Sequence, residues 1–252
     1  MHIGTHVERD RSKRLMAMGQ MAASLAHEIR NPLGSMELYC SLLKRDLAGQ
    51  PEPFQLADRI YQGIKALDRV ISNCLQFARD IQPERQIVKD VGEWISEIVS
   101  AVRPQATING VALGCEILGN HNAWIDSHLI EQVIYNIILN GIDAVVEYKA
   151  SSNSAADYLP AVSIVSDASS KEFWRIDVVD NGGGIPAELR ERIFDPFFTT
   201  KTKGTGLGLA VVHSIVAAHG GHIEIERVGG EKTKFSIFIP SCHTITRKES
   251  DV

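Results

Sequence analysis

The first 80 residues carry the hydrophobic pattern of two amphipathic helices. Apolar residues recur at intervals of three and four, the spacing that gathers side chains on one face of an α-helix. The first run is Leu15, Met18, Ala22, Leu25, Ile29, Met36, Tyr39 and Leu43, and the second is Leu56, Ile60, Ile64, Leu67, Ile71, Cys74 and Ala78. Between them the segment GQPEP is a strong helix breaker. The pattern predicts a helical hairpin.

A hairpin of this kind has an apolar face left over. Two amphipathic helices cannot bury both of their apolar seams against each other, so a four-helix bundle made by two chains is the natural solution. We therefore expect a homodimer. The alternative is that the hairpin packs back on the rest of its own chain, which the polar segment IQPERQIVKD after the second helix disfavours.

From about residue 88 the pattern changes to short strands mixed with helices. The strand-like runs are VALGCEIL, AVSIVS, FWRIDVVD, HIEIERV and TKFSIFIP, and the helical runs are VGEWISEIVSAVRP, SHLIEQVIYNIILNGIDAVVEY and GLAVVHSIVAAHG. This mixture predicts an α+β fold, an α/β sandwich in which helices cover one face of a mixed sheet. We expect a helical domain over 1–82, a linker over 83–90, the sandwich over 91–241 with a surface loop at 149–160, and a frayed tail over 242–252.

Composition narrows the function only a little. The chain has 252 residues, of which 44% are hydrophobic and 23% charged, as in ordinary globular proteins. The net charge is −5, without the dense basic stripe of a nucleic-acid binder. We find neither a signal peptide nor an apolar run of about 20 residues that would span a membrane. The four cysteines form no CxxC pair, so we expect reduced thiols in a cytoplasmic protein.

The stretch over 180–212 is the most informative part of the sequence. It sets two glycine-rich segments around a Phe-rich loop. The second segment, GTGLGLA, opens a helix, and backbone N–H groups at a helix N-terminus form an anion site. The first, DNGGG, follows a strand and places Asp180 at a bend where a flat ring can approach the backbone. Together they predict a nucleotide site.

Asparagine residues mark a second candidate site. Asn136 and Asn140 are four residues apart on one predicted helix, so their amides face the same way. A helix–helix hydrogen bond would satisfy them. The functional interpretation is a Mg²⁺ site, because magnesium takes few protein oxygens and completes its shell with waters and phosphate oxygens.

His27 is a candidate nucleophile on the first predicted helix. In a heptad that starts at Leu15, His27 takes position f, which points away from the seam. An ordinary surface histidine would also sit there. Its neighbours favour chemistry: Glu28 adjoins it, Asn31 lies one turn later on the same face, and Pro32 loosens the helix locally. A neutral imidazole near pH 7 is a competent nucleophile.

These segments resemble the sequence boxes of sensor histidine kinases. The matches are Asp180, Gly182 and Gly184 to the first glycine box, Phe194 to Phe198 to the phenylalanine box, Gly204, Gly206 and Gly208 to the second glycine box, Asn136 and Asn140 to the asparagine box, and SLAHEIRNPL at 24–33 to the phosphoacceptor box. They occur in the family's order, and the resemblance covers about residues 12–241.

The resemblance implies a role for each box. His27 would accept the phosphoryl group, Glu28 would act as its base, and Asn31 would orient water for removal of phosphate from a partner protein. Asn140 would bind Mg²⁺ directly and Asn136 would support it. Asp180 would accept a hydrogen bond from the adenine amine, which selects ATP over GTP.

The Phe-rich loop and its flanks carry further expectations. Phe194, Phe197 and Phe198 would anchor a mobile lid, and at least one of them is expected in the core. Lys201 and Lys203 can reach phosphates, although loop lysines are often only solvated. The family usually has Ala at the position of Gly141, a departure that costs helix propensity and leaves the Asn140 carbonyl intact. We expect His213, His219 and His222 to be structural.

The resemblance therefore implies an ATP-dependent protein-histidine autokinase that uses Mg²⁺ and passes the phosphoryl group from His27 to an aspartate of a response regulator. Phosphatase activity on that regulator is a further expectation. One alternative is an ATP-driven conformational machine of the gyrase and chaperone type, but those proteins have Glu where Asn136 stands. A non-catalytic phosphotransfer scaffold is another, although the intact boxes argue against it. We also expect the chain to be a catalytic core cut from a longer protein or to receive its signal from a separate partner.

Overall fold

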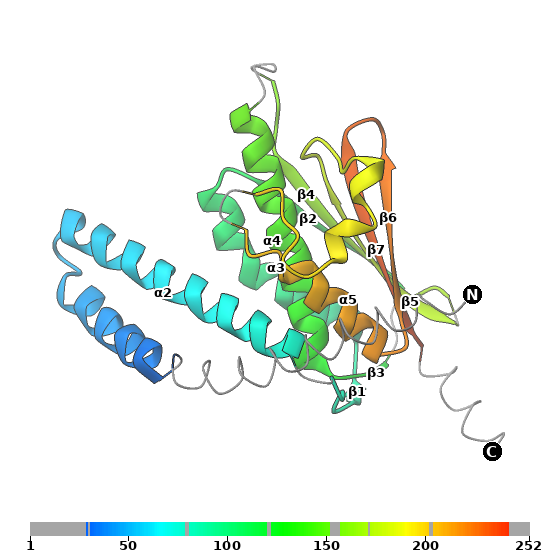
Figure 1. The fold of residues 1–252 in the computed structure, drawn as a ribbon, viewed down its shortest axis with the longest axis horizontal. Helices are drawn as coiled ribbons and strands as arrows, with labels where there is room; N and C mark the ends of the chain where they lie inside the picture. The colour runs from blue at the N-terminus through cyan, green and yellow to red at the C-terminus, as the bar shows by residue number, and fades with distance from the viewer. Residues whose placement is uncertain are drawn as a thin grey trace, which may run out of the picture. The chain divides into compact units, whose positions relative to one another are not determined.

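The structure is a computed structural model, and it describes residues 29, 31–78, 81–119, 122–151, 157–170, 172–201 and 204–241, with the backbone alone for 66 and 69–78. His27, Glu28, Lys203 and the tail over 242–252 lie outside this part of the chain. The chain divides into two compact units, Met1–Asp80 and Ile81–Val252, which we describe separately (Figure 1).

The first unit is the helical hairpin that the sequence predicts. One helix covers residues 31–46, and after a turn α2 runs over Pro51–Ala78. The breaker is shorter than expected, because Pro51 and Pro53 belong to the first turn of α2. Proline is tolerated there since the first N–H groups of a helix have no intrahelical partner. The first α-helical bond joins the Phe54 N–H to the Gln50 carbonyl at 3.0 Å.

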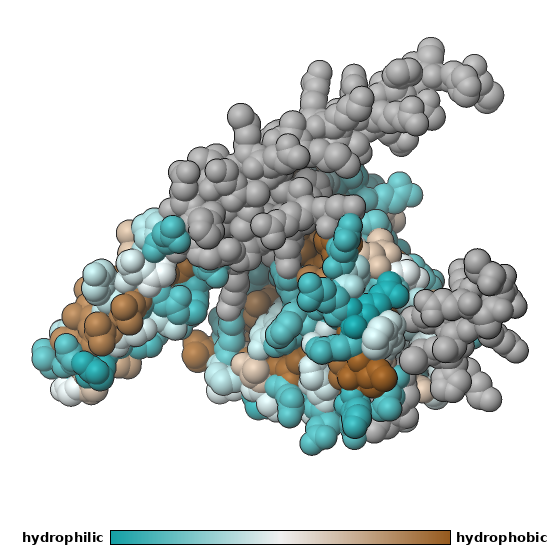
Figure 2. All heavy atoms as spheres, turned by 90° about the horizontal axis from the view of Figure 1, so that it is seen from below, coloured by the Kyte–Doolittle hydropathy of each residue, from teal (hydrophilic) through white to brown (hydrophobic). Residues whose placement is uncertain are grey.

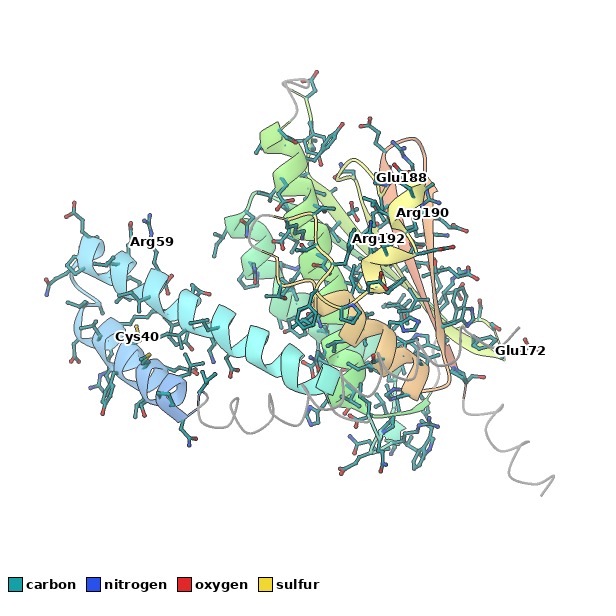
Figure 3. The ribbon with its side chains drawn as sticks, viewed as in Figure 1. Cys40, Arg59, Glu172, Glu188, Arg190 and Arg192 are labelled. Carbon is teal, nitrogen blue, oxygen red and sulfur yellow. The ribbon has the colours of Figure 1, made fainter. Side chains whose placement is uncertain are left out.

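The contact between the two helices is narrow and partly polar. Its buried core consists of Leu33, Cys40 and Ile64. The Cys40 thiol, between the helices in Figure 3, donates to the Ala57 carbonyl at 3.4 Å. Ion pairs flank this core, Lys44 with Asp58 at 2.5 Å and Lys65 with Glu37. Charged pairs thus replace apolar packing over part of the seam.

The apolar seams read from the sequence mostly face outward in this unit. Brown hydrophobic surface gathers on the hairpin at the left of Figure 2. Exposed members of the two predicted seams are Ile29, Met36, Tyr39, Leu43, Leu56, Ile60 and Leu67. Exposed apolar side chains in such a continuous set normally mark a protein–protein contact. The hairpin by itself therefore leaves the apolar surface that the sequence pattern anticipates.

The second unit is built on a five-stranded mixed sheet in the order β2-β4-β5-β7-β6. The strands are β2 (Ala112–Leu118), β4 (Ala161–Asp167), β5 (Phe173–Asp180), β6 (His222–Val228) and β7 (Lys232–Pro240). Only β2 and β4 pair in parallel, and the other neighbours are antiparallel. All five coincide with strand-like runs in the sequence, so the predicted α+β class is confirmed.

Three helices cover one face of this sheet: α3 (Val91–Ile108), α4 (Ser127–Ser151) and α5 (Gly208–Ala218) (Figure 1). The core between the layers is rich in isoleucine and contains Ile134, Ile164, Ile176 and Ile237. Trp174 is fully buried there and donates its indole N–H to Ser166 at 2.9 Å. Alternation along each strand puts these residues on the helix side of the sheet.

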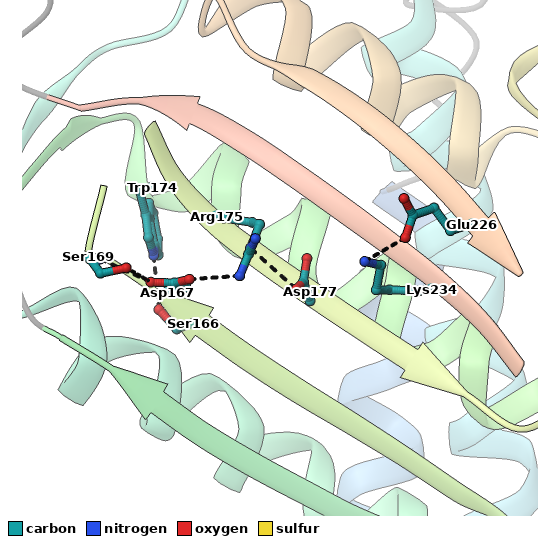
Figure 4. A network of polar contacts seen from close by, with 8 residues as sticks. All are labelled: Ser166, Asp167, Ser169, Trp174, Arg175, Asp177, Glu226 and Lys234. Atoms are coloured by element: carbon teal, nitrogen blue, oxygen red, sulfur yellow. Dashed lines mark hydrogen bonds and ion pairs between the residues drawn. The ribbon is translucent and has the colours of Figure 1, made fainter. Parts of the chain in front are cut away.

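Charged residues occupy alternate positions on the other face of the sheet (Figure 4). Arg175 lies between Asp167 and Asp177, with N–O distances of 2.7 and 3.3 Å. Farther along, Lys234 of β7 pairs with Glu226 of β6 at 2.6 Å. Opposite charges on adjacent strands stabilise the pairing modestly. These contacts explain why every second residue of these strands, on the face opposite the helices, is polar or charged at these positions.

A small two-stranded ribbon was not anticipated. It consists of β1 (Gln86–Val88) and β3 (Ala123–Ile125), which pair antiparallel. The segment expected as a linker thus contains a strand of the second unit. Arg85 just before it donates to the carbonyl of Ala218 at the end of α5, at 3.0 Å. Three-residue strands are too short to show alternation, and their partners are distant in sequence.

Helix α4 runs through the middle of the helical layer. Among the described helices it alone has the length and hydropathy of a membrane span, an exception to the expectation from the sequence. Its buried residues instead belong to the core of this unit, since Ile130, Ile134 and Ile138 are fully buried. Core helices pass the same test of length and composition. Gly141 lies in this helix, facing the sheet.

We expect Gly141→Ala to stabilise the protein. A β-carbon at this position would lie 3.4 Å from both Val162 and Asp180, in ordinary van der Waals contact. Alanine should then raise the free energy of unfolding by roughly 0.5–1 kcal/mol through helix propensity. Denaturant unfolding would measure the gain. The matched variant Gly182→Ala should instead destabilise, because its β-carbon would lie 2.7 Å from the Ala144 carbonyl carbon. A loss of stability in Gly141→Ala would contradict this account.

Candidate functional site

The predicted asparagine pair lies on α4 beside the start of α5. Both side chains are half-buried. The Asn136 Nδ2 is buried and has no hydrogen-bond partner among the described residues. A β-carbon on Gly208, where α5 begins, would lie 3.8 Å from Asn136 Oδ1. The asparagine box and the second glycine box, far apart in sequence, therefore meet in the fold.

The N-terminus of α5 is open to a ligand. Leu207, the residue before the helix, makes no side-chain capping hydrogen bond. An α-helix leaves its first N–H groups without an intrahelical partner, and together with the helix dipole they favour an anion. The amide of Asn136 lies at this end of the helix. This arrangement is suited to phosphate.

Asp180 ends β5 on the helix side of the sheet and is only 4% exposed. Its carboxylate accepts the N–H of Gly182 at 2.9 Å and a hydrogen bond from the Thr233 hydroxyl. Burial raises the pKa of Asp180 to about 6, although these two bonds and the positive charge of Lys201 oppose the shift. Such a shifted carboxyl in a concave site is typical of functional positions.

The backbone after Asp180 passes very close to α4. A β-carbon on Gly182 would lie 2.8 Å from Ala144 Cβ, so no larger residue fits. Gly183 and Gly184 have φ values of 87° and 78°, a region that favours glycine. The first glycine box therefore forms a bare backbone surface beside a buried carboxylate, which is the geometry that a flat base requires.

The Phe-rich loop folds onto the second glycine box. Phe197 has a φ of 66°, unusual for a non-glycine residue, and its N–H donates to the Gly206 carbonyl at 3.0 Å. A β-carbon on Gly206 would lie 2.4 Å from the Phe197 carbonyl carbon. Gly204 is similarly close to the Thr199 side chain. Each glycine is thus required by close approach within the loop.

The expectation that one of the three phenylalanines belongs to the core is wrong. Phe194 and Phe198 are half-buried and Phe197 is 55% exposed, whereas the neighbouring Ile193 is buried. The two half-buried rings pack on polar partners: Phe194 lies 5.3 Å from the His213 ring, and the guanidinium of Arg192 lies 4.5 Å from the centre of Phe198 (Figure 3).

Lys201 follows this loop and pairs with α4. Its Nζ lies 3.1 Å from Asp143 Oδ2, one turn beyond Asn140. The Asp143 side chain is 57% exposed, so the pair is weak. Lys201 therefore lies close enough to Asp180 to affect its charge, and it is bound to α4 one turn beyond Asn140.

Of the predicted phosphoacceptor box at 24–33, the structure describes Ile29 and residues 31–33. Asn31 is exposed on the first helix, and its carbonyl accepts the Ser35 hydroxyl at 3.3 Å. Its side-chain amide faces solvent. His27 and Glu28 lie outside the described residues.

Sequence reasoning missed Thr233. It lies opposite Asp180 in the β5–β7 register, which brings its hydroxyl to that carboxylate. Nothing local in TKFSIFIP marks it, because its role follows from strand pairing.

The structural interpretation of His219 is confirmed: its Nδ1–H donates to the Ile215 carbonyl, its Nε2 accepts the Asp126 N–H, and burial lowers its pKa.

The asparagine pair suits a divalent cation that takes most of its ligands from phosphate and water. It does not suit a metal held entirely by protein ligands. No cluster of three or more His, Cys, Asp or Glu suitable for a metal occurs in the described chain. Magnesium needs only one or two protein oxygens when phosphate supplies others. The side-chain oxygens of Asn136 and Asn140, four residues apart on α4, offer that small share.

The buried carboxyl predicts a pH effect on stability. Because burial raises the folded-state pKa of Asp180 from its ordinary 3.8 to about 6, ionisation favours the unfolded chain. Its stability contribution should therefore fall as pH rises from about 4 to 7, by up to about 3 kcal/mol. Asp180→Asn should remove that loss. Denaturant unfolding of both proteins without nucleotide, across this pH range, measures it; parallel curves for the two would refute the assignment.

Known proteins share this architecture. The chain matches the "His Kinase A (phospho-acceptor) domain" over residues 17–83 and the "Histidine kinase-, DNA gyrase B-, and HSP90-like ATPase" over residues 125–243. It is 34% identical to the sensor histidine kinase ZraS of Escherichia coli (strain K12) over 245 residues, which cover 96% of this chain and 49% of that protein. It is 30% identical to sporulation kinase C of Bacillus subtilis (strain 168) over 239 residues, 91% of this chain and 50% of that protein.

Solved structures agree. The crystal structure of histidine kinase ThkA in complex with response regulator protein TrrA superposes with a TM-score of 0.62 and 26% identity, covering 96% of this chain and 67% of that one. Full-length ShkA in complex with AMPPNP gives 0.67 at 23% identity over 89% of this chain and 46% of that one, which shows the fold.

The chain spans about half the length of the curated relatives it matches. The matched regions contain all the sequence boxes discussed above. The two domain matches, the named relatives and the meeting of the boxes in the fold lead to one conclusion: the chain belongs to the sensor histidine kinases, and carries their phosphoacceptor domain followed by their ATPase-like domain.

Proposed function

We propose that the chain is the catalytic core of an ATP-dependent protein-histidine autokinase. The observation that carries this proposal is the buried, unpartnered Asn136 amide beside the uncapped N-terminus of α5. A buried polar group without a partner is costly, and its retention is explained by a ligand. The ATPase-like match and the kinase relatives support ATP as that ligand.

Base recognition would fall to Asp180 and the glycine loop after it. The ionised carboxylate accepts a hydrogen bond from the exocyclic amine of adenine, a donor that guanine lacks at the equivalent position. Gly182 and Gly184 let the ring lie against the backbone. The phosphates would extend toward Gly206 and Gly208 at the start of α5. Lys201 would add a positive charge after release from Asp143.

Magnesium would be held by the Asn140 side-chain oxygen, with Asn136 in support. When bound, Mg²⁺ neutralises charge on the phosphate chain. The protein's own contribution is then positioning: the base is fixed by Asp180 and the phosphates by α5, so the γ-phosphorus is presented in one orientation. In phosphoryl transfer, positioning and charge stabilisation supply most of the rate.

The acceptor would be His27. One ring nitrogen of its neutral imidazole forms the N–P bond as the bond from the γ-phosphorus to the bridging oxygen breaks, and ADP leaves with the electron pair. Glu28 relieves the other ring nitrogen of its proton as positive charge develops. The phosphoryl group would then pass to an aspartate carboxylate of a response regulator. The complex of ThkA with response regulator TrrA supports a partner of this class.

Phosphatase activity on that regulator is a second proposal. Asn31 is exposed on the first helix, four positions after His27 in the sequence, so its amide can meet a docked protein. An amide can orient a water molecule without transferring a proton.

We place both activities in the cytoplasm, where ATP is present and free thiols such as Cys115 stay reduced.

A homodimer would cover the outward apolar seams of the hairpin. Four side chains of these seams are at least half-exposed in the single chain: Met36, Tyr39, Ile60 and Leu67. Burying such a stripe against its own symmetric copy completes a four-helix bundle. The match to the phosphoacceptor domain supports the same assembly.

Incubation with γ-labelled ATP and Mg²⁺ tests the kinase. We expect acid-labile, base-stable label on the wild-type protein and none on His27→Ala. Excess EDTA should also abolish the label, because it removes the Mg²⁺ that neutralises the phosphate charge. Subsequent addition of a receiver domain should remove the label from the kinase. Free phosphate without labelled protein would instead indicate a conformational ATPase, and would refute this proposal.

Charge on the outward seam tests the dimer. Ile60→Glu should convert the protein to a monomer in light-scattering chromatography, because a buried unpaired carboxylate is strongly unfavourable at an apolar interface. Ile60 is 50% exposed in one chain, so the hairpin itself should tolerate the change. Arg59→Ala, at an exposed neighbouring position, serves as the control and should remain dimeric (Figure 3). A dimeric Ile60→Glu protein would place the interface elsewhere.

A further inference from the structure

Tyr148 of α4 lies directly beneath the first glycine box. A β-carbon on Gly183 would lie 2.7 Å from Tyr148 Cδ2 and 2.9 Å from Cε2, so the ring rests against the glycine backbone. Gly183 has a φ of 87°, and the loop has no side chain of its own with which to hold this shape. The tyrosine ring supplies a floor for it.

The hydroxyl of Tyr148 fixes that floor to a distant part of the chain. It donates to the carboxylate of Glu231, in the turn between β6 and β7. A hydrogen bond to a charged acceptor is stronger than a neutral one. Because β7 also presents Thr233 to Asp180, the same hairpin contacts both the recognition carboxylate and the loop that follows it.

A third contact comes from Arg227 near the end of β6. A β-carbon on Gly184 would lie 3.1 Å from Arg227 Nε, so the arginine borders the last glycine of the loop. Its own Nε donates to the Gly230 carbonyl in the hairpin turn, which ties the side chain to the hairpin. The hairpin tip therefore touches the loop through Arg227 and, by way of Tyr148, through Glu231.

The other side of the loop is held by Tyr158. Its hydroxyl lies 2.9 Å from the Asn181 carbonyl and 3.1 Å from its Oδ1, and burial raises the pKa of this phenol to about 12. The rings of Tyr158 and Tyr148 meet edge to face at 5.2 Å. With Tyr158 fixed on one side, the Tyr148–Glu231 bond closes the support on the other.

We propose that Tyr148, anchored by Glu231, is a positioning residue for base recognition, holding the Gly182–Gly184 backbone where a purine ring must lie against it. The proposal rests on the proposed nucleotide site. Tyr148 acts through the loop and not by touching the phosphates. Its loss should therefore weaken binding of the base without slowing phosphoryl transfer in the saturated enzyme.

The test uses the full chain with the variants Tyr148→Phe and Glu231→Ala, and their double variant. Tyr148→Phe keeps the ring and removes the bond. We expect the dissociation constant for Mg-ADP, measured by calorimetry, to rise about three- to tenfold in each single variant. Affinity for GDP, which does not match the Asp180 acceptor, should change less. The double variant should be no weaker than either single one, because both remove the same bond. The kcat for autophosphorylation at saturating ATP should stay within twofold.

Glu224→Ala is the matched control, since Glu224 is an exposed carboxylate of the same hairpin, on β6. It should bind Mg-ADP as the wild type does. Unchanged ADP affinity in Tyr148→Phe, or additive losses in the double variant, would overturn the inference. An equal fall in ADP and GDP affinity together with a lower melting temperature would reduce the tyrosine to ordinary packing and overturn it too. A wild type that binds ADP without labelling His27 would instead refute the kinase proposal alone.

Discussion

The close approach of α4 to the end of β5 is the constraint on which the site depends. At Gly182 the two backbones are so near that a β-carbon would lie 2.7–2.9 Å from three atoms of Ala144. The residues that matter on α4 repeat at four-residue intervals: Asn136, Asn140, Ala144 and Tyr148. At a rise of about 1.5 Å per residue this stripe is about 18 Å long, comparable with an extended nucleotide. One helix face thus runs from Asn136, beside the start of α5, to Tyr148, against the first glycine box.

This stripe is tolerated because the rest of α4 is strongly apolar. Buried isoleucines at 130, 134, 137, 138 and 142 hold the helix on the sheet. Against that packing, the protein carries an unpartnered Asn136 amide and a buried Asp180 carboxyl with a pKa of about 6. Both are unfavourable in the free protein and become useful when a ligand satisfies them. Stability is given up at a binding site and supplied by the surrounding core.

Much of this architecture could be predicted from the sequence. Alternation identified all five strands of the main sheet, and helical spacing identified α3, α4 and α5. Boundaries were less certain: α3 continues through Pro104 to Ile108, although the proline ended the predicted run. The loop glycines were found because their spacing is local. Thr233 and Glu231 were not, since each acts on a residue more than fifty positions away and only strand pairing brings them together.

The Phe-rich loop shows a second reason for failure. Three aromatic residues in five positions suggested that at least one lies in the core, yet none of them is buried, whereas the nearby Ile193 is only 9% exposed. Hydrophobicity predicts burial only on average. Here Phe197 adopts a left-handed backbone and hydrogen-bonds to Gly206, so the loop path is set by backbone contacts and not by ring burial. A sequence pattern shows how apolar a segment is, but it does not show which backbone groups will hydrogen-bond to each other.

The glycine loop after Asp180 shows how bare backbone and rigidity are reconciled. Consecutive glycines permit the close approach to Ala144, but they lose more conformational entropy on folding than other residues. A loop without side chains cannot hold itself, so the order must come from neighbours. Tyr158 bonds to Asn181 on one side, and Tyr148 lies under Gly183 on the other. The neighbours that contact its three glycines are Ala144 and Tyr148 of α4 and Arg227 of the β6–β7 hairpin. The first glycine box is therefore defined as much by distant tyrosines and a hairpin carboxylate as by its own sequence.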